Sequence, residues 1–421
     1  MRADRIGKEP GAVSRIDLGF RSAGRPQTAQ YFSLPKLVIF VLVLAAVSWY
    51  LASTYPSLRS LGGKRERIAQ TSDAAPTLRD AAEKHHLQMG AAAESLHLSQ
   101  APYAATLARE YSALEAADEM KFDHIHPEPD SYNFAGPDAL VAFAQTHSMK
   151  VRGHVLIWHR ALPGWILVRD WMQIQSGPSP PWTPLALNKV LAEHIATAVR
   201  RYRGKIYAWD VVNEPFNEDG SMRSSIWYEK PGIGFAGEGT KYIEQALIWA
   251  HAADPDAKLF VNEYNAETLN QKSDAMYAMA QDFVSRGVPL NGIGLQLHLE
   301  SDFNSFDSLR RNIHRLAELG LQVQFTEVDV RLRDDSDSSL RAQAEIYKDL
   351  LDTCLREPAC TLFQTWGFTD MYSWIPEAYT GYGWALPFDL SYRKKPAYDA
   401  MLKRLQSLDN VEPRPKTSRE N

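Results

Sequence analysis

Cysteine is nearly absent from this sequence: of 421 residues, only Cys354 and Cys360 carry a thiol. A zinc site built on cysteine needs more ligands than two, so that class of metal centre is excluded. The two residues are either buried free thiols or partners in a local disulfide bond, and a disulfide bond would require an oxidising compartment. Composition alone does not choose between these two states.

Positive charge is not in excess either. The chain has 46 Lys and Arg residues against 51 Asp and Glu residues, which gives a formal net charge of −5 at pH 7. No global basic field is available to attract a polyanion, so nucleic acid is not expected as a partner. With 45% hydrophobic and 23% charged residues, the composition is that of an ordinary globular protein.

Several motifs that mark other enzyme classes are missing. There is no H-E-x-x-H pattern, and the one H-x-H, His124–His126, runs straight into Pro127 as a loop would. No G-x-S-x-G elbow presents a serine nucleophile, and no G-x-G-x-x-G follows the first expected strand. A metal site could be drawn from His298, Glu327 and Asp329, but without a supporting motif we expect no metal ion and no other cofactor.

One long apolar run lies near the N-terminus. Leu37–Ala52 is uncharged and almost wholly apolar, and Trp49 and Tyr50 near its end resemble interfacial anchors. The preceding segment is long for a signal-peptide n-region, and no convincing small-x-small cleavage site follows the run. We therefore predict a cytoplasmic segment over 1–36, a transmembrane signal-anchor over 37–52 and a linker over 53–76; a cleaved signal peptide is the alternative.

From residue 77 to residue 408, strand-like apolar runs alternate with amphipathic helical patterns, and the polar tail 409–421 is predicted to be disordered. Such alternation over more than 300 residues is typical of parallel β/α units. An open doubly wound sheet and a closed barrel are the two possible architectures. The missing dinucleotide motif and a weaker eighth strand pattern favour a single (β/α)₈ TIM barrel. The expected strands cover residues 87–93, 113–115, 150–158, 206–212, 258–261, 292–298, 322–327 and 361–366, and the expected helices include 185–203, 238–252, 272–286, 306–319 and 339–356.

The ends of the expected strands are rich in polar and aromatic side chains. Catalytic groups in such barrels sit at the C-terminal ends of the strands, so we predict one polar, aromatic cleft on that face. The chain has 11 Trp, 18 Tyr and 16 Phe residues, which first serve the core but also suit stacking against the apolar faces of sugar rings. The strand-end residues are His154, Trp158, Asn213, Glu214, Asn262, Glu263, Tyr264, Gln296, His298, Glu327, Asp329, Trp366 and Asp370.

Two of these carboxylates suit acid–base chemistry. Glu214 ends the fourth expected strand and Glu327 the seventh, and these strands lie on opposing sides of an eight-stranded barrel. Glycoside hydrolysis requires such a pair, one to protonate the leaving oxygen and one to attack the anomeric carbon or activate water. A strand-end glutamate can equally serve a structural ion pair, but Asn213 beside Glu214 can bind a sugar hydroxyl. A histidine between two carboxylates, His298 between Glu327 and Asp329, would hold a nucleophile ionised and oriented.

Seven ordered motifs run along the chain: VRGHVLIWH (151–159), WDVVNEP (209–215), NEYN (262–265), GIGLQLHL (292–299), FTEVDVR (325–331), WGFTDMYSWIP (366–376) and KKPAY (394–398). With these motifs, the chain resembles glycoside hydrolase family 10, the endo-β-1,4-xylanases, over roughly residues 77–405. The resemblance implies a (β/α)₈ barrel, retention of anomeric configuration and no cofactor.

The resemblance also implies roles for single residues. It implies that Glu214 is the acid/base, that Glu327 is the nucleophile, and that His298 and Asp329 orient the nucleophile. The family often has a disulfide bond before the last strand, where Cys354 and Cys360 fall, and this favours a bonded pair in an exported domain. Sugar contacts next to the cleaved bond are implied for Lys121, His154, Trp158, Asn213, Gln296, Trp366 and Trp374.

Departures from the family pattern cluster at one place. Where the family has Glu-Asn before the Met-Lys pair and Trp after it, this chain has Ala117, Asp118 and Phe122. The family's Gln two places after the W-H histidine is replaced by Ala161, next to Arg160. The missing groups bind the second sugar on the non-reducing side, whereas the reacting sugar keeps its usual partners. Recognition of a plain xylan backbone is therefore expected to be altered while the catalytic machinery stays intact.

These observations lead to one expected function. We expect a retaining endo-β-1,4-glycanase that acts as a monomer on a xylan-type polysaccharide. Because a polymer substrate lies outside the cell, the domain is expected to be extracytoplasmic, in the periplasm or on the cell surface, and held to the membrane by the N-terminal helix. Two alternatives are an enzyme that trims an exopolysaccharide of the same cell and a catalytically silent carbohydrate-binding barrel.

Overall fold

The computed structural model describes residues 75–167 and 182–408 of the chain. The predicted cytoplasmic segment, signal-anchor and tail, and nearly all of the linker, lie outside these residues, so they stay predictions. In the two described ranges, no helix has the length and apolar character needed to cross a membrane. The structure below belongs to the compact unit Ala74–Asn421.

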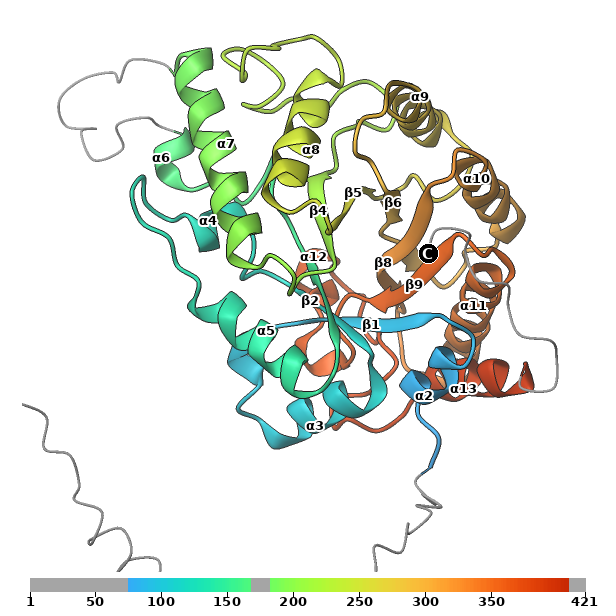
Figure 1. The fold of residues 1–421 in the computed structure, drawn as a ribbon. Helices are drawn as coiled ribbons and strands as arrows, with labels where there is room; N and C mark the ends of the chain where they lie inside the picture. The colour runs from blue at the N-terminus through green and yellow to red at the C-terminus, as the bar shows by residue number, and fades with distance from the viewer. Residues whose placement is uncertain (1–74, 168–181, 409–421) are drawn as a thin grey trace, which may run out of the picture. The chain divides into compact units, whose positions relative to one another are not determined.

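Eight parallel strands close into a barrel with helices around its outside (Figure 1). The strands are paired in the order β6-β5-β4-β3-β2-β1-β9-β8, and β6 pairs with β8 to complete the ring. The predicted (β/α)₈ TIM barrel is therefore confirmed, including the weak second strand. The barrel strands are β1 (Gln88–Ala93), β2 (Ala113–Ala116), β3 (Lys150–Gly153), β4 (Ala208–Asn213), β5 (Lys258–Glu263), β6 (Gly292–Leu295), β8 (Gln322–Arg331) and β9 (Cys360–Thr365).

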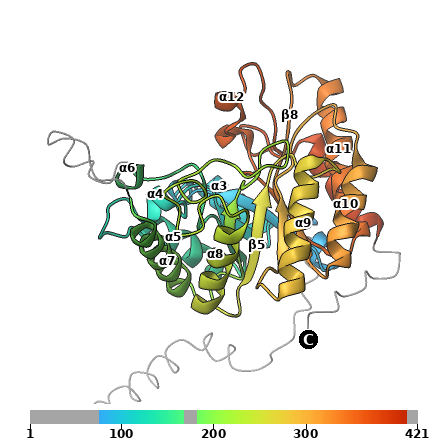
Figure 2. The same cartoon turned by 90° about the horizontal axis from the view of Figure 1, so that it is seen from above.

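Helices alternate with the strands and form the outer layer of the unit (Figures 1 and 2). The longer helices are α2 (Leu78–Glu83), α3 (Ala101–Glu110), α5 (Ala135–Thr146), α7 (Pro184–Arg201), α8 (Lys241–Ala253), α9 (Gln271–Arg286), α10 (Phe306–Glu318), α11 (Asp337–Arg356) and α13 (Pro396–Ser407). Short helical segments are η2 (Ser95–His97), α4 (Phe122–Ile125), α6 (Gly164–Leu167), η4 (Asp370–Tyr372) and α12 (Ile375–Ala378).

Capping residues at both ends of α9 account for where this helix begins and ends. At the N-terminus, the Asn270 side chain accepts a hydrogen bond from the Ser273 backbone N–H, and the Ser273 hydroxyl lies within hydrogen-bonding distance of the Asn270 backbone N–H. At the C-terminus, Gly287 has a φ of 70°, a left-handed conformation that glycine adopts without steric cost. Buried side chains recur between these ends at three- and four-residue intervals, so one face of α9 packs on the barrel.

The hydrophobic core lies between the barrel and its helices, while the barrel interior is partly polar. Val323 and Phe325 on β8 are fully buried, as is Tyr347 on α11. Side chains alternate along a strand, and Gln324 between them accepts a hydrogen bond from the Arg152 guanidinium on β3 at 2.9 Å. The interior below the C-terminal strand ends therefore already contains charged groups.

Three expected strands have clearly different C-terminal ends in the structure. The expected strand 150–158 is a strand only up to Gly153, as β3. The run 292–298 is divided, because Leu297, with a φ of 63°, separates β6 from the short strand β7 (His298–Glu300). β8 extends to Arg331, beyond its expected end, because β7 gives it a pairing partner. In that pairing His298 lies opposite Asp329, which places the two side chains next to each other.

The disulfide bond implied by the family resemblance is confirmed. Cys354 at the end of α11 is bonded to Cys360 at the start of β9, with 5.2 Å between their Cα atoms.

Removing this bond is expected to destabilise the barrel moderately. The bond closes a short loop of the chain, and loop-closure entropy assigns roughly 2 kcal/mol to a loop of this size. Replacing both Cys354 and Cys360 with alanine should lower the free energy of unfolding, measured by urea denaturation, by about that amount. The wild-type protein under reducing conditions is the control and should show a similar loss; equal stability with and without the bond would contradict the expectation.

A buried histidine on α7 is expected to make stability depend on pH. The ring of His194 stacks on Phe122 at 3.7 Å, and neither ring nitrogen has a hydrogen-bond partner among the described residues. Burial lowers the pKa of His194 well below its usual value, with a smaller contribution from His126. The unfolded chain therefore binds a proton below about pH 6.5 that the folded protein does not bind. As pH is lowered through this range, the free energy of unfolding decreases by up to about 1.4 kcal/mol per pH unit.

A comparison of the wild-type protein with one variant tests this expectation. The wild-type protein should lose more stability than His194→Leu when urea denaturation at pH 7.5 is compared with pH 5.5, by about 1 kcal/mol. Equal losses in the two proteins would show that His194 is not the responsible group. The test uses the change with pH within each protein, so the cost of the substitution itself cancels.

Candidate active site

One cavity of about 560 Å³ lies at the C-terminal ends of the strands. Nearly every side chain expected to contact sugar or to take part in catalysis lines it. The exception is Asp329, which is fully buried behind His298. The cavity-lining residues among those expected are Lys121, His154, Trp158, Asn213, Glu214, Gln296, His298, Glu327, Trp366 and Trp374.

The backbone holds Glu214 in an unusual conformation directly after β4. Its φ is 55°, which is uncommon for a residue with a side chain and is found where surrounding structure over-determines the conformation. The Glu214 backbone N–H donates to the Asn262 carbonyl at 2.8 Å, and the Arg223 guanidinium donates to the Glu214 carbonyl at 2.9 Å. These two bonds fix the point from which the carboxyl group enters the cavity.

Three donors surround the Glu214 carboxyl group. The indole N–H of Trp158 donates to Oε2 at 2.9 Å. The side-chain amides of Asn213 and Gln296 donate to Oε1 at 3.3 and 3.2 Å. The carboxyl group is thus held in one orientation at the cavity wall by residues from three different strand ends.

Glu327 is held on β8 by a separate set of partners. Its side chain accepts hydrogen bonds from the Asn262 amide at 2.7 Å and from Nε2 of His298 at 3.0 Å. Nδ1 of His298 donates to Asp329 at 2.8 Å, and the indole N–H of Trp374 donates to the same Asp329 oxygen at 2.9 Å. The expected order, with His298 between two carboxylates, is therefore present.

The contacts around Glu327 and His298 determine which of these two side chains carries a charge. Burial by itself would raise the pKa of Glu327, but the hydrogen bond from His298 and the positive charges of His154 and His298 outweigh it and hold the pKa below its usual value. Burial would also lower the pKa of His298, but Asp329 and Glu327 raise it well above its usual value. Glu327 is therefore ionised and His298 protonated at neutral pH.

Asn262 is the residue at this site whose contribution the sequence reasoning missed. Its amide donates to the side-chain oxygen of Asn213 at 2.9 Å as well as to Glu327, and its oxygen accepts from the Thr326 hydroxyl at 2.7 Å. Asn262 thus connects the neighbourhoods of the two glutamates. Its place at the end of the fifth strand put it among the expected cleft residues but did not indicate which side chains it would bind.

A buried charged network, also missed, lies beneath the cavity. The Arg152 guanidinium donates to Glu115 at 2.7 Å and to both carboxylate oxygens of Asp210. Nδ1 of His154 lies 2.9 Å from Asp210. Burial outweighs the charges of Arg152 and His154 and raises the pKa of Glu115 to about 7. His154 therefore contacts the cavity on one side and this network on the other.

Two of the sequence departures, Ala117 and Asp118, line the same cavity, as does Arg160, whereas Phe122 and Ala161 do not line it. The Lys121 ammonium is paired with Asp118 and lies over the Trp158 ring, 5.3 Å from its centroid. Burial would raise the pKa of Asp118, but Lys121 outweighs burial and lowers it, so Asp118 is ionised. Lys121 is consequently committed in part to a neighbour rather than fully available to a sugar.

A (β/α)₈ barrel that brings an ionised glutamate, a second glutamate and several tryptophan rings to one cavity defines a glycoside hydrolase. The chain belongs to glycosyl hydrolase family 10, whose model matches residues 77–404. The earlier resemblance is thereby confirmed.

Individual relatives cover the whole barrel. The chain is 40% identical over 329 residues to "Endo-1,4-beta-xylanase B" of Thermotoga neapolitana, covering 77% of this chain and 90% of that protein. The crystal structure of xylanase 10B from Thermotoga petrophila RKU-1 in complex with xylobiose is similar with a TM-score of 0.73 and 41% identity, over 79% of this chain and 98% of that one. A glycosylated family 10 endo-β-1,4-xylanase from Gloeophyllum trabeum gives a TM-score of 0.70 at 33% identity, over 78% and 98% of the two chains.

Proposed function

We propose that this glycoside hydrolase is a retaining endo-β-1,4-glycanase that cleaves a xylan-type polysaccharide. The observation that carries the proposal is the ionised Glu327, held by His298 and Asn262, in the same cavity as Glu214. The relatives support the substrate class, since they are named endo-1,4-β-xylanases and one was solved with xylobiose.

The first step breaks the glycosidic bond. A carboxylate oxygen of Glu327 attacks the anomeric carbon while Glu214 gives its proton to the glycosidic oxygen, which leaves as the alcohol of the released sugar. The product of this step is a glycosyl ester on Glu327. Because His298 and Asn262 bind Glu327, its oxygen is fixed in place before the substrate arrives.

The second step releases the sugar. Glu214, now a carboxylate, takes a proton from water, and the resulting hydroxide attacks the anomeric carbon and breaks the ester to Glu327. Two inversions at the same carbon restore the original configuration. Trp158, which donates to Glu214, would hold this side chain in both of its roles.

The remaining cavity residues are proposed to bind the reacting sugar. His154 and Lys121 offer donors to its hydroxyl groups, and Trp366 and Trp374 offer flat apolar surfaces to its ring faces. Asn213 and Gln296, which share a hydrogen bond at 3.2 Å, both line the cavity and both donate to Glu214.

The stereochemistry of hydrolysis tests this proposal. The purified protein should release the β-anomer first from xylo-oligosaccharides, as followed by proton NMR before mutarotation. Release of the α-anomer first would contradict the assigned roles. The protein is also tested on a panel of polymers. If it cleaves an exopolysaccharide of the producing cell but not xylan, the substrate class is that exopolysaccharide. If it cleaves no polymer, a catalytically silent sugar-binding barrel is favoured.

We further propose that the segment 37–52 anchors the protein in a membrane with the barrel outside the cytoplasm. The disulfide bond between Cys354 and Cys360 supports this location, because such bonds persist in oxidising compartments. In untreated cells, the protein should be found in the membrane fraction. Protease added to intact cells with a permeable outer layer should digest the barrel. Full protection of the barrel would argue for a cytoplasmic location.

A further inference from the structure

Beneath the cavity lies a buried carboxylate with an unused oxygen. Glu115 on β2 is fully buried, and its Oε2 accepts the hydrogen bond from Arg152. Its other oxygen, Oε1, has no hydrogen-bond partner within residues 75–167 and 182–408. Arg152 also binds Asp210, so one guanidinium group serves two carboxylates. Leaving a buried carboxylate oxygen without a partner costs free energy, and a bound cation would remove that cost.

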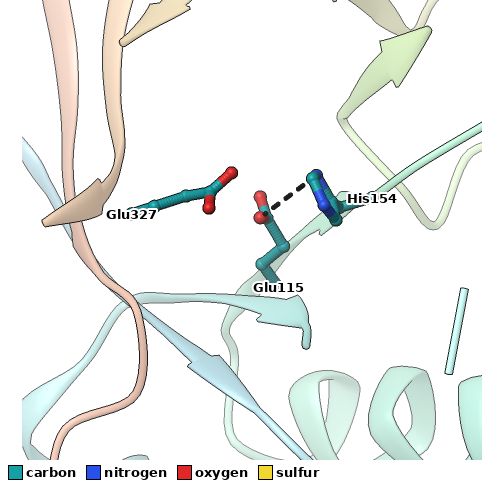
Figure 3. A group of neighbouring side chains, drawn as sticks. All are labelled: Glu115, His154 and Glu327. Carbon is teal, nitrogen blue, oxygen red and sulfur yellow. Dashed lines mark ion pairs between the residues drawn. The ribbon is translucent and has the colours of Figure 1, made fainter. Parts of the chain in front are cut away.

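The unused oxygen faces two other groups that can bind a metal ion. Figure 3 shows the side chains of Glu115 on β2, Glu327 on β8 and His154, directly after β3, pointing toward one another. One ligand atom from each of the three lies within 4.8 Å of the others, and Glu115 Oε1 lies 3.7 Å from Nδ1 of His154. The hydrogen bonds that Glu327 accepts leave lone pairs free, since each carboxylate oxygen has two.

The donor set suits a particular class of ion. Two carboxylates and one imidazole are ligands that Zn²⁺ accepts at distances of about 2.0–2.2 Å, so a contraction on the order of 1 Å by side-chain rotation would complete the site. Nδ1 of His154 now shares a hydrogen bond of 2.9 Å with Asp210. The ion would take the place of the Nδ1 proton in that bond, and Asp210 would then lie beside the ion as a further carboxylate. His154 and Glu327 line the cavity, so an ion reaches the site from solvent and a water molecule can take the fourth position.

We propose that Glu115, His154 and Glu327 form a site for Zn²⁺ or a similar divalent transition-metal ion, and that the bound ion inhibits hydrolysis. An electron pair of Glu327 that is donated to the metal is not available to attack the anomeric carbon. The ion and the water on it also occupy space at the floor of the sugar site, so inhibition is competitive with substrate. The binding site rests on the geometry alone, whereas inhibition rests on the proposed role of Glu327 as nucleophile.

Direct binding of Zn²⁺ to the full chain, measured by calorimetry, tests the site. The wild-type protein should bind one ion at this site, and Glu115→Gln, which keeps an oxygen for Arg152 but loses the charge, should weaken binding at least tenfold. Glu94→Gln is the matched control, because Glu94 lines the same cavity but is not one of the three ligands; its zinc affinity should equal that of the wild type. Glu115→Asp, which retains the charge but withdraws the oxygen, should also weaken binding and serves if the glutamine variant does not fold.

Hydrolysis rates with added ZnCl₂ test the consequence. Zinc should raise KM for xylo-oligosaccharides without changing kcat, and Glu115→Gln should need at least ten times more zinc for the same effect. No zinc binding at millimolar concentration, or equal binding by Glu115→Gln and wild type, would overturn the site. Zinc binding by a protein that hydrolyses no polymer would leave the site intact and reject the proposed function instead.

Discussion

Replacing Glu327 with alanine is expected to reduce kcat/KM on the order of 10⁴-fold or more with every substrate. The side chain is the proposed nucleophile, and no other carboxylate that lines the cavity in the described structure is held between His298 and Asn262. The loss should not depend on how good the leaving group is, because formation of the glycosyl ester requires Glu327 in every case. Rates on xylan and on aryl xylobiosides measure this directly.

Glu214→Ala should behave differently and serves as the matched comparison. A general acid contributes roughly 10²–10⁴-fold, so hydrolysis of xylan should fall within that range. With an aryl xylobioside whose leaving group needs no proton, the first step should be nearly as fast as in the wild type, and a burst of released phenol should precede slow turnover. Added azide should restore the second step and give a β-glycosyl azide.

The opposite pattern in the two variants would exchange the roles of the two glutamates. A similar loss in both variants for all leaving groups, without rescue by azide, would reject the double-displacement mechanism. Both variants remove a side chain at the cavity wall rather than in the core, so thermal unfolding should show that each remains folded.

The second large effect is expected at the altered second-sugar site. The triple variant Ala117→Glu, Asp118→Asn and Ala161→Gln restores three polar partners that the family pattern provides. Each hydrogen bond contributes on the order of 1 kcal/mol, so kcat/KM on linear xylo-oligosaccharides should rise roughly a hundredfold. The change at Asp118 also removes the ion pair with Lys121 and frees that ammonium group for the substrate. Binding energy from this remote sugar lowers the barrier at the reacting one.

A pair of substrates provides the control for this variant. An aryl β-xyloside has one sugar and does not reach the second site, so its hydrolysis should change little. An aryl β-xylobioside has two sugars and should gain nearly the full factor. If the natural protein already cleaves linear xylan as well as the triple variant, the departures are without consequence and xylan is recognised in another way.

The strand–helix alternation predicted the barrel because parallel strands bring their C-terminal ends to one face whatever the loops between them do. For that reason the expected neighbours Glu214, Gln296 and Glu327 do line one cavity. The division between β6 and β7 was not predictable, because the positive φ of Leu297 depends on its surroundings rather than on its residue type. Adjacent strand ends alone suggested that His298 lies near Glu327 and Asp329, but the pairing that sets His298 opposite Asp329 requires β7.

The contacts that the sequence did not predict depend on register between strands. Asn213 lies opposite Asn262 in the pairing of β4 with β5, and Glu115 lies opposite Arg152 in the pairing of β2 with β3. A one-residue shift would place each side chain on the other face of its strand, and a hydrophobic pattern does not determine the register of short strands that closely. The network around Arg152 is therefore visible only in three dimensions.

Covalent trapping tests the central claim most directly. A 2-deoxy-2-fluoro-xylobioside with a good leaving group forms the glycosyl ester quickly and releases it slowly, so the intermediate accumulates. Mass spectrometry of the intact protein should show one added fluorosugar, and peptide sequencing should place it on Glu327. A label on Glu214, or an active enzyme that acquires no label, would contradict the assignment of Glu327 as the nucleophile of a retaining glycoside hydrolase.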